Sequence, residues 1–436
     1  EAVRVLNKIF GECKMIYVCN FPEIYKRLSH FKRYKDIELS TIVHSTSAWS
    51  LKVVKDYIYI IDKVICIHKK IKDAFINIGI SPTKLFVLPN WVECNEISIR
   101  DKLKKNDICI KYKISPNSTI IGMITRINDD KNVISAINIL NKLNKIDNFH
   151  LLIIGDGKRE IITRQINNFK LNDKVTITGF LDSKSIYDIG NAIDLCINTS
   201  TLEGSPISLL EQMAMGIYCV YPSVGEIKSV LGDYGSIIQI NERDGGSYTD
   251  AEENLFVNEI IKIYKSEQIY DSIKINNYMK NTRDTDILAQ LYKTIITGYS
   301  NGLSFIITAM DDEENVEKCL LSIVDIADEI IFVDQLSTDR TYENAKKLSE
   351  KYENIKIYKF LNETPMRGDD YNKNIEKYNY SIADYYNYCL LFATHKNIIK
   401  WNCNFVANRI NLKEMILKYD LKNRDEKFCL CITGET

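Results

Sequence analysis

The sequence predicts an α/β protein built on parallel sheets, and three observations support this fold class. Short runs rich in β-branched residues alternate with amphipathic stretches along the whole chain, a pattern typical of strand–helix–strand units. The length of 436 residues suits about three such domains. With 45% of its residues apolar, the chain can fill a hydrophobic core in each of them.

Strands and helices can be placed along the first part of the chain from these patterns. The predicted strands cover residues 41–44, 64–67, 85–88, 120–124, 150–154, 174–177, 195–198 and 218–221. Helical patterns separate them, for example at 133–144 and 205–215. Pro89-Asn90-Trp91 follows a predicted strand and opens a polar stretch, so we expect a hinge between two domains there.

A second boundary is expected at the turn residues Ser300-Asn301-Gly302. A long helical pattern over 253–297 precedes this turn, and predicted elements at 304–308, 316–323, 329–333 and 398–401 follow it. The predicted domains are therefore 1–93, 94–300 and 301–436. The chain opens with Glu1 in mid-pattern rather than with a methionine, and we expect it to be a fragment.

Composition narrows the class of function. The 57 basic and 58 acidic residues nearly cancel, whereas a protein that binds nucleic acid would show a basic excess. The 12 cysteines include no CxxC pair, so reduced thiols of a cytoplasmic protein are expected rather than a zinc site. No apolar run approaches the roughly 20 residues that span a bilayer, which leaves peripheral contact with a membrane open.

The segment Glu203-Gly-Ser-Pro-Ile-Ser-Leu-Leu-Glu211 is the first candidate site. Ser205 suits an N-cap and Pro206 the first helical position, so a helix is expected to begin there. It follows a predicted strand, and ligands of open α/β sheets bind at that edge. Helix N-termini favour phosphate. Glu203 and Glu211 could reach a hydroxyl-bearing ligand, although a single glutamate on a helix is more often a solvated surface residue.

Arg126 and Lys131 form the second candidate group. They follow the predicted strand at 120–124 and should face the same edge of the same sheet. Cleavage of a nucleoside-diphosphate sugar builds negative charge on the leaving diphosphate. Two fixed cations would stabilise that transition state more than the ground state. An ordinary basic loop is the alternative reading of this pair alone.

Together these residues resemble the family 4 glycosyltransferases. Glu203 and Glu211 match the paired-glutamate motif of that family, and Arg126 and Lys131 match the pair that grips the donor diphosphate. The likeness runs over about residues 41–231. Its other matching positions are Gly155-Asp-Gly157, Gly179 and Val224-Gly225.

The resemblance implies a GT-B fold with two Rossmann-like domains, the first truncated, and a nucleotide-sugar donor bound between them. It implies that Glu203 contacts donor-sugar hydroxyls and that Glu211 contacts the ribose. It also implies that transfer retains the anomeric configuration and needs no metal, because Arg126 and Lys131 serve instead of a cation. The remaining donor-binding residues that it implies are Asn90, Gly122, Gly204, Ser205, Pro206 and Ile207.

This sequence also departs from the family pattern. Gln212 replaces a usual alanine, and Glu226 stands where a second glycine is common. Only about ninety residues precede the hinge, and the N-terminal glycine-rich acceptor loop is not found. His44 could line the cleft, or it could be a structural histidine at a strand end.

Residues 303–341 resemble the opening of a family 2 glycosyltransferase, which implies a partial GT-A-like α/β domain. Asp312, Asp334 and Asp339 match its nucleotide-binding positions, although acidic residues at strand ends are often helix caps. The family's metal motif should follow the strand at 398–401, where Asn402 and Asn404 stand. Neutral amides are poor ligands for Mg²⁺ or Mn²⁺, so a divalent metal is not expected unless the motif lies elsewhere, for instance at Asp369-Asp370.

The sequence therefore predicts a glycosyltransferase that moves a sugar from a nucleotide sugar to a glycan, lipid or other acceptor, in surface polysaccharide or glycoconjugate synthesis. A nucleotide-sugar 2-epimerase and a noncatalytic nucleotide-sugar-binding scaffold remain alternatives. A Rossmann dehydrogenase is disfavoured, because no GxGxxG opens a strand–turn–helix unit.

Overall fold

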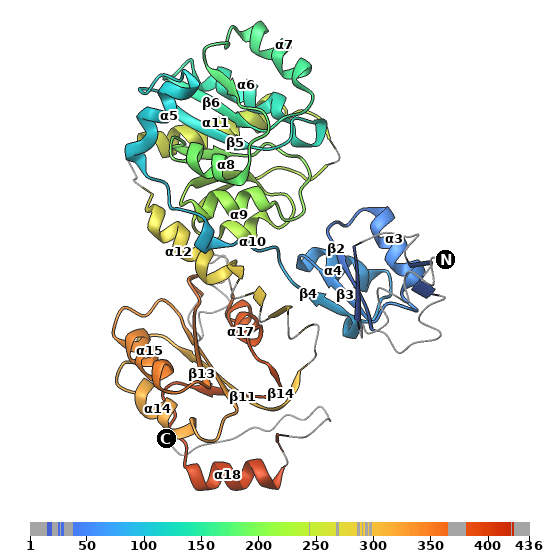
Figure 1. The fold of residues 1–436 in the computed structure, drawn as a ribbon, viewed down its shortest axis with the longest axis vertical. Coiled ribbons are helices and arrows are strands. Elements are labelled where there is room, and N and C mark those ends of the chain that lie inside the picture. Colours follow the sequence, from blue (N-terminus) through green and yellow to red (C-terminus); the bar gives the residue numbers. More distant parts are fainter. Residues whose placement is uncertain are drawn as a thin grey trace. The chain divides into compact units, whose positions relative to one another are not determined.

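The computed structural model describes residues 15–19, 25–26, 28–29, 38–243, 245–266, 270–285, 288–289, 291–292, 295, 299–364, 381–419 and 421–422. These residues contain three parallel sheets (Figure 1). The chain divides into two compact units, residues 1–288 and 289–436. The first unit holds two of the sheets and the second unit holds the third.

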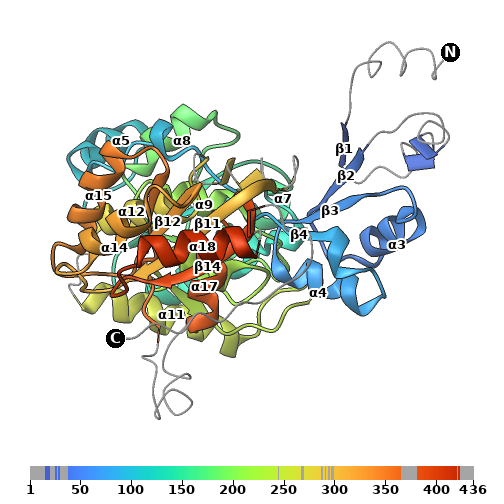
Figure 2. The same cartoon turned by 90° about the horizontal axis from the view of Figure 1, so that it is seen from below.

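The N-terminal sheet has the strand order β1-β2-β3-β4. Its strands are β1 (Met15–Cys19), β2 (Glu38–Val43), β3 (Lys63–Cys66) and β4 (Leu85–Val87). The strands predicted from residue 41 to residue 88 are confirmed within a few residues. Helices α3 (Ala48–Tyr57) and α4 (Lys69–Asn77) lie beside the sheet (Figure 2). These helices bury the apolar side chains of Val54, Ile71 and Phe75 completely.

The middle sheet has the order β10-β9-β8-β5-β6-β7. The chain enters at the central strand, runs outward to one edge, returns to the centre, and runs outward to the other edge. This is a doubly wound sheet whose switch point lies between β5 and β8. Its strands are β5 (Thr119–Ile124), β6 (Phe149–Ile154), β7 (Val175–Ile177), β8 (Leu195–Ile197), β9 (Tyr218–Pro222) and β10 (Gly235–Ile238).

Helices connect the strands of the middle sheet, as expected for parallel strands. The connecting helices are α6 (Val133–Leu143), α7 (Arg159–Phe169), α8 (Ser183–Gly190), α9 (Ile207–Ala214) and α10 (Ile227–Leu231). Helix α5 (Lys105–Tyr112) precedes β5, and α11 (Asp250–Lys265) and α12 (Ser272–Thr282) follow β10. Strand β6 is buried along its whole length. That burial explains why its sequence is an almost continuous apolar run.

Two sequence predictions in this region are wrong. The single helical pattern over 253–297 is interrupted, because Asp271 accepts hydrogen bonds from Ile273 N and Lys274 N and starts α12 as a separate helix. Helix α9 is capped by Pro206 rather than Ser205. The Ser205 hydroxyl is buried and finds no hydrogen-bond partner among the described residues.

A buried histidine is expected to make the stability of the first unit depend on pH. His150 on β6 is 2% exposed and shares a 2.9 Å hydrogen bond with Thr176 Oγ1. Burial lowers its pKa from 6.5 to about 4, and Lys174 acts in the same direction. The unfolded chain therefore binds this proton first, and the unit should lose stability as the pH falls from 6.5 to 4. In urea unfolding at several pH values, His150→Gln should lose less stability over that range, and equal pH slopes would contradict the assignment.

The second unit has a sheet of order β13-β12-β11-β14. Its strands are β11 (Ser300–Ala309), β12 (Glu329–Asp334), β13 (Ile355–Lys359) and β14 (His395–Asn402). Its helices are α14 (Val316–Ile323), α15 (Thr341–Lys351), α17 (Ile382–Leu390) and α18 (Arg409–Lys418). The predicted elements at 304–308, 316–323, 329–333 and 398–401 are confirmed. Helices α14, α15 and α18 contribute to one apolar core with the sheet.

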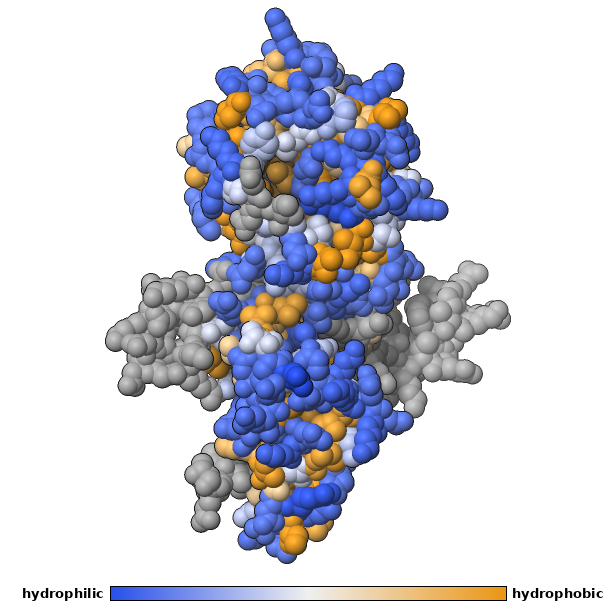
Figure 3. Space-filling model, turned by 90° about the vertical axis from the view of Figure 1, so that its left-hand side faces the viewer, coloured by the Kyte–Doolittle hydropathy of each residue, from blue (hydrophilic) through white to orange (hydrophobic). Residues whose placement is uncertain are grey.

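One face of the surface can be compared by hydropathy. The face seen in Figure 3 is mostly hydrophilic, with small separate apolar areas. No helix among the described residues is both long enough and apolar enough to cross a bilayer. Buried, free thiols are found at Cys66, Cys94, Cys109, Cys196, Cys219, Cys319, Cys389 and Cys403.

Candidate active site

The two candidate groups of the middle domain meet at the switch point of its sheet. Strands β5 and β8 are paired neighbours, with Gly122 opposite Cys196. The loop after β5 carries Arg126 and Lys131, and the loop after β8 carries Glu203. Both loops therefore lie at the carboxyl edge where ligands of doubly wound sheets bind.

Lys131 and Glu203 form an ion pair of 2.8 Å. The Lys131 side chain is 16% exposed and the Glu203 side chain 8% exposed. The same carboxylate oxygen, Oε1, also accepts hydrogen bonds from Ser200 Oγ at 2.7 Å and from Asn198 Nδ2 at 3.5 Å. Charge-assisted bonds of this kind are stronger than neutral ones, so Glu203 is held in one place.

Arg126 has an exposed side chain on a fixed backbone. Its side chain makes no hydrogen bond or ion pair with any residue that the structure describes. The adjoining Ile127 donates its N–H to Asp156 O at 2.8 Å and accepts from Lys158 N at 2.7 Å. Backbone hydrogen bonds thus join the loop carrying Arg126 to the Gly155-Asp-Gly157 loop, while the guanidinium stays available to a ligand.

The close pairing of these two backbones requires the glycines of the Gly155-Asp-Gly157 loop. Gly155 has φ of +148°, and a Cβ there would lie 1.8 Å from the carbonyl oxygen of Thr125. A Cβ at Gly157 would lie 2.3 Å from Ile127 O. Only glycine allows the two backbones to approach so closely.

The loop at the start of α9 is held from three sides. Asn90 Nδ2 donates to Ser205 O at 2.8 Å, and Glu226 N donates to Gly204 O at 2.9 Å. A Cβ at Gly204 would lie 2.9 Å from His44 O, which follows β2. Asn90 and His44 thus contact this loop from the N-terminal sheet. Ile207, the first helical residue, is 55% exposed.

Two predicted donor-binding residues have structural partners away from the ion pair. Gly122 lies inside β5, where a Cβ would be 2.5 Å from the Ile193 side chain. Glu211 lies in the second turn of α9 and hydrogen-bonds to Tyr187 of α8. Burial raises the pKa of Glu211, and the Tyr187 bond opposes that shift. The structure therefore brings Arg126, Lys131 and Glu203 to one edge but gives Glu211 a partner on α8.

The two departures from the family pattern have local roles. Gln212 is fully buried, and its Oε1 accepts a 2.9 Å hydrogen bond from Tyr221. Glu226 pairs with Arg283 at 3.1 Å, and both side chains are nearly buried. Gln212 thus satisfies a buried hydroxyl, and Glu226 ties the loop beside Gly204 to the end of α12.

Ser200 and Asn198 were missed by the sequence predictions. Residues 198–201 read Asn-Thr-Ser-Thr and are all buried. A run of small polar residues directly after a buried strand is the signal that could have identified them, because such side chains must find hydrogen-bond partners when they are buried.

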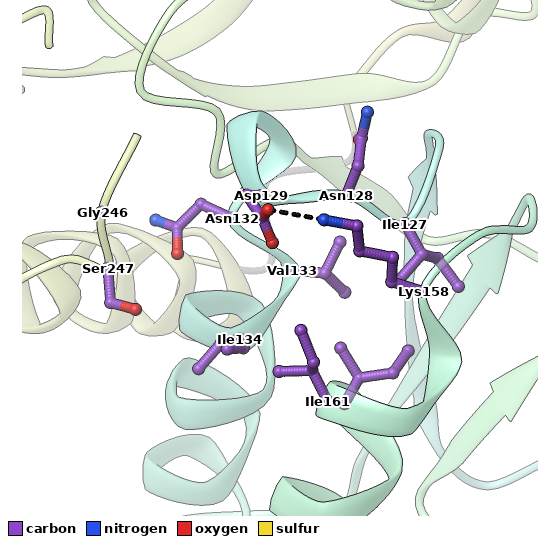
Figure 4. A pocket seen from close by; sticks show the side chains of 11 residues that line it. Ile127, Asn128, Asp129, Asn132, Val133, Ile134, Lys158, Ile161, Gly246 and Ser247 are labelled. Carbon is purple, nitrogen blue, oxygen red and sulfur yellow. Dashed lines mark hydrogen bonds and ion pairs between the residues drawn. The ribbon is translucent and has the colours of Figure 1, made fainter. Parts of the chain in front are cut away.

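A cavity of about 190 Å³ lies at the starts of α6 and α7 (Figure 4). Asn132 and Ile134 of the α6 end, Lys158 and Ile161 of the α7 end, and Ser247 are among its lining residues. Lys158 forms an ion pair of 2.8 Å with Asp129 at this cavity. None of the predicted donor-binding residues lines it.

The acidic residues predicted for the second unit have different surroundings. Asp334 ends β12 and is 2% exposed. Its Oδ1 has no hydrogen-bond partner among the described residues. Burial raises the pKa of this carboxyl. Burial also raises the pKa of Asp312. Asp339 accepts backbone N–H groups of Thr341 and Glu313 at 2.9 and 3.0 Å. Asp334 Oδ1 is therefore buried without a partner among the described residues, whereas Asp339 holds the loop through backbone N–H groups.

The expected metal motif lies at the end of β14. Asn402 ends β14, and its Oδ1 accepts a hydrogen bond from Lys400. Within the described part of the chain, no three His, Cys, Asp or Glu side chains are placed to hold a metal ion. The alternative position, Asp369-Asp370, lies outside the described residues.

Two parts of the chain match known family models. Residues 104–280 match the family model "Glycosyl transferases group 1", and residues 304–366 match "Glycosyl transferase family 2". The chain thus carries a region similar to the group 1 glycosyl transferases, followed by a region similar to family 2, and the resemblance of both regions is confirmed.

Individual relatives are distant. An Escherichia coli UDP-Gal:alpha-D-GlcNAc-diphosphoundecaprenol alpha-1,3-galactosyltransferase is 24% identical over 254 residues, 55% of this chain and 60% of that protein. A Streptococcus pneumoniae alpha-monoglucosyldiacylglycerol synthase is 21% identical over 56% of this chain and 60% of its own. The chain thus spans less than two thirds of either relative.

Solved structures share the fold. Anabaena HepE, crystallised with UDP and glucose, has a TM-score of 0.57 at 17% identity, covering 68% of this chain and 80% of its own. A Rickettsia africae glycosyltransferase has a TM-score of 0.56 at 18% identity, with the same two coverages. The predicted α/β fold of GT-B type is confirmed.

Proposed function

We propose that this chain transfers a sugar from a nucleoside-diphosphate sugar to an acceptor, with retention of anomeric configuration, at the edge that carries Arg126, Lys131 and Glu203. The observation that carries the proposal is the Lys131–Glu203 ion pair at the switch point, with the exposed Arg126 on the same loop after β5 as Lys131. The names of the two relatives, one acting on a diphosphoundecaprenol and one making a glycosyldiacylglycerol, support a lipid-linked acceptor.

The charges at this edge suit the chemistry of such a donor. Without a ligand, Lys131 neutralises Glu203. A donor places its diphosphate on Arg126 and Lys131, and Glu203 accepts hydrogen bonds from the sugar hydroxyls. As the bond between the anomeric carbon and the diphosphate breaks, its electron pair moves to the diphosphate, where the two cations stabilise it. The acceptor hydroxyl oxygen bonds to the anomeric carbon and its proton passes to the leaving diphosphate. The protein thereby supplies with side chains the positive charge that a metal ion supplies in other transferases.

A second, noncatalytic role is proposed for the last unit. Asp334 offers one buried oxygen without a partner, and the amides Asn402 and Asn404 lack the charge that a divalent cation favours. These features support nucleotide binding without transfer in residues 301–436.

The direct test is to incubate the chain with UDP-, GDP- and ADP-sugars and a short-chain lipid diphosphate acceptor, and to measure released nucleoside diphosphate. Release with at least one donor is expected, with the α-anomer retained in the product by NMR. If no donor is consumed and no nucleoside diphosphate raises the melting temperature of the protein, the proposal fails.

Chelation is predicted to leave this activity unchanged, because Arg126 and Lys131 carry the charge. Rates should agree with and without 5–10 mM EDTA, on the order of the concentrations that strip Mg²⁺ or Mn²⁺ from exposed oxygen ligands. Loss of transfer on chelation, restored by added Mn²⁺, would place the chemistry in the last unit instead.

A further inference from the structure

Tyr248 forms a hydrogen bond with the loop that carries Glu203. The tyrosine is 5% exposed, and its hydroxyl donates a 3.0 Å hydrogen bond to the carbonyl oxygen of Ser200. Ser200 in turn donates its own hydroxyl to Glu203 Oε1 at 2.7 Å. Tyr248, which lies 48 positions after Ser200 in the chain, is therefore hydrogen-bonded to the residue that binds the Glu203 carboxylate.

The same tyrosine is linked through Ser135 of α6 to the turn that carries Lys131. Its backbone N–H donates to Ser135 Oγ at 2.9 Å, across 113 positions of the chain. Ser135 donates its hydroxyl to Asn132 Oδ1 at 2.9 Å, and Asn132 directly follows Lys131. Both Ser135 and Asn132 are buried.

Further bonds close this arrangement into a ring. Thr199 Oγ1 donates to Asn132 O at 2.9 Å and so links the two loops directly. Arg243 N donates to Thr201 O at 3.0 Å, next to the Tyr248 contact. Starting from Lys131, the ring runs through Asn132, Ser135, Tyr248, Ser200 and Glu203 and returns to Lys131 by the ion pair.

We infer that Tyr248 is a positioning residue that holds the Lys131 ammonium and the Glu203 carboxylate at their working separation. The inference rests on the proposed function, in which these two groups bind diphosphate and sugar. Fixed groups act without reorganisation when charge develops, so loosening either loop lowers the rate of transfer more than the affinity for the donor.

The competing explanation is that Tyr248 only fills the core. Its ring stacks on Phe256 at a centroid distance of 5.6 Å, and the Arg243 guanidinium lies 5.6 Å from the ring centroid. Phenylalanine keeps these ring contacts and removes the hydroxyl. Tyr248→Phe therefore separates the two explanations.

The experiment compares Tyr248→Phe with Tyr218→Phe in the full chain. Tyr218 is also buried and shares a 3.0 Å hydrogen bond with Ser236, but it lies at the amino end of β9, opposite the site edge. In Tyr248→Phe the kcat should fall about fivefold with little change in donor KM, as expected for one lost hydrogen bond. Tyr218→Phe should keep the wild-type kcat. In a Glu203→Gln background, Tyr248→Phe should have little further effect.

A second readout does not depend on turnover. Lys131 can be acetylated with a limiting amine reagent and quantified by peptide mass spectrometry, with exposed Lys158 as the internal reference. The labelling of Lys131 should rise about fivefold in Tyr248→Phe and should not change in Tyr218→Phe. Unchanged labelling and kcat in Tyr248→Phe would overturn the inference. If labelling rises but no donor is ever consumed, the positioning role stands and the proposed function fails.

Discussion

Arg126→Ala should lower the rate of sugar transfer by about 10²–10³, the loss seen when one donor to a developing anion is removed. The variant should fold normally, because the Arg126 side chain is exposed and bonds to no other described residue. The measurement is nucleoside diphosphate release at saturating donor, together with the melting temperature.

The matched control is Arg159→Ala, which removes an arginine from the start of α7. Arg159 pairs with Asp156 at 2.8 Å on the surface and is not among the donor-binding residues. The activity of Arg159→Ala should equal that of the wild type. Lys131→Ala should also lose about 10²–10³ in rate, but with some loss of stability, because it leaves the nearly buried Glu203 carboxylate unpaired. Normal turnover in both Arg126→Ala and Lys131→Ala would refute the diphosphate assignment.

Gly225→Ala should have the second large effect. Gly225 has φ of +60°, and a Cβ there would lie 2.3 Å from Glu203 O and 2.5 Å from Gly204 O. Neither contact can be relieved by turning a side chain, because both oxygens belong to the backbone of the Glu203 loop. That loop must move, and a displacement of about 1 Å at such a site can cost about 10²-fold in rate.

Gly79→Ala separates this clash from the ordinary cost of an alanine at positive φ. Gly79 has φ of +92°, and nothing lies within 4 Å of its Cβ position. Both variants carry a backbone penalty of about 1 kcal/mol, but only Gly225→Ala should lose most of its activity. Similar kinetics for the two variants would show that the approach of residue 225 to the Glu203 loop has no part in transfer.

The sequence alone determined the local features of this protein. Alternating β-branched runs and amphipathic stretches identified the parallel α/β class and most of the strands, because periodicity depends only on neighbouring residues. The paired glutamates, the Arg126 and Lys131 pair and the aspartates after residue 303 identified the two glycosyltransferase families. These motifs can be read without knowing which strands are neighbours.

Local signals failed where a distant contact overrode them. Ser205 is a good N-cap residue by type, yet its loop is bound by Asn90 and packed against Gly225, and Pro206 caps the helix instead. Asp339 stays a predicted nucleotide-binding residue, and only the structure shows that its carboxylate accepts the backbone N–H groups of Thr341 and Glu313.

Only the tertiary structure decided which groups act together. Strand order places β8 beside β5 and so brings Glu203 to Lys131, 72 residues earlier in the chain. The same packing gives Glu211 a partner on α8 and brings Tyr248 between the two loops. Hydrogen bonds across such separations leave no periodic trace in the sequence, because they depend on which parallel strands become neighbours when the sheet forms.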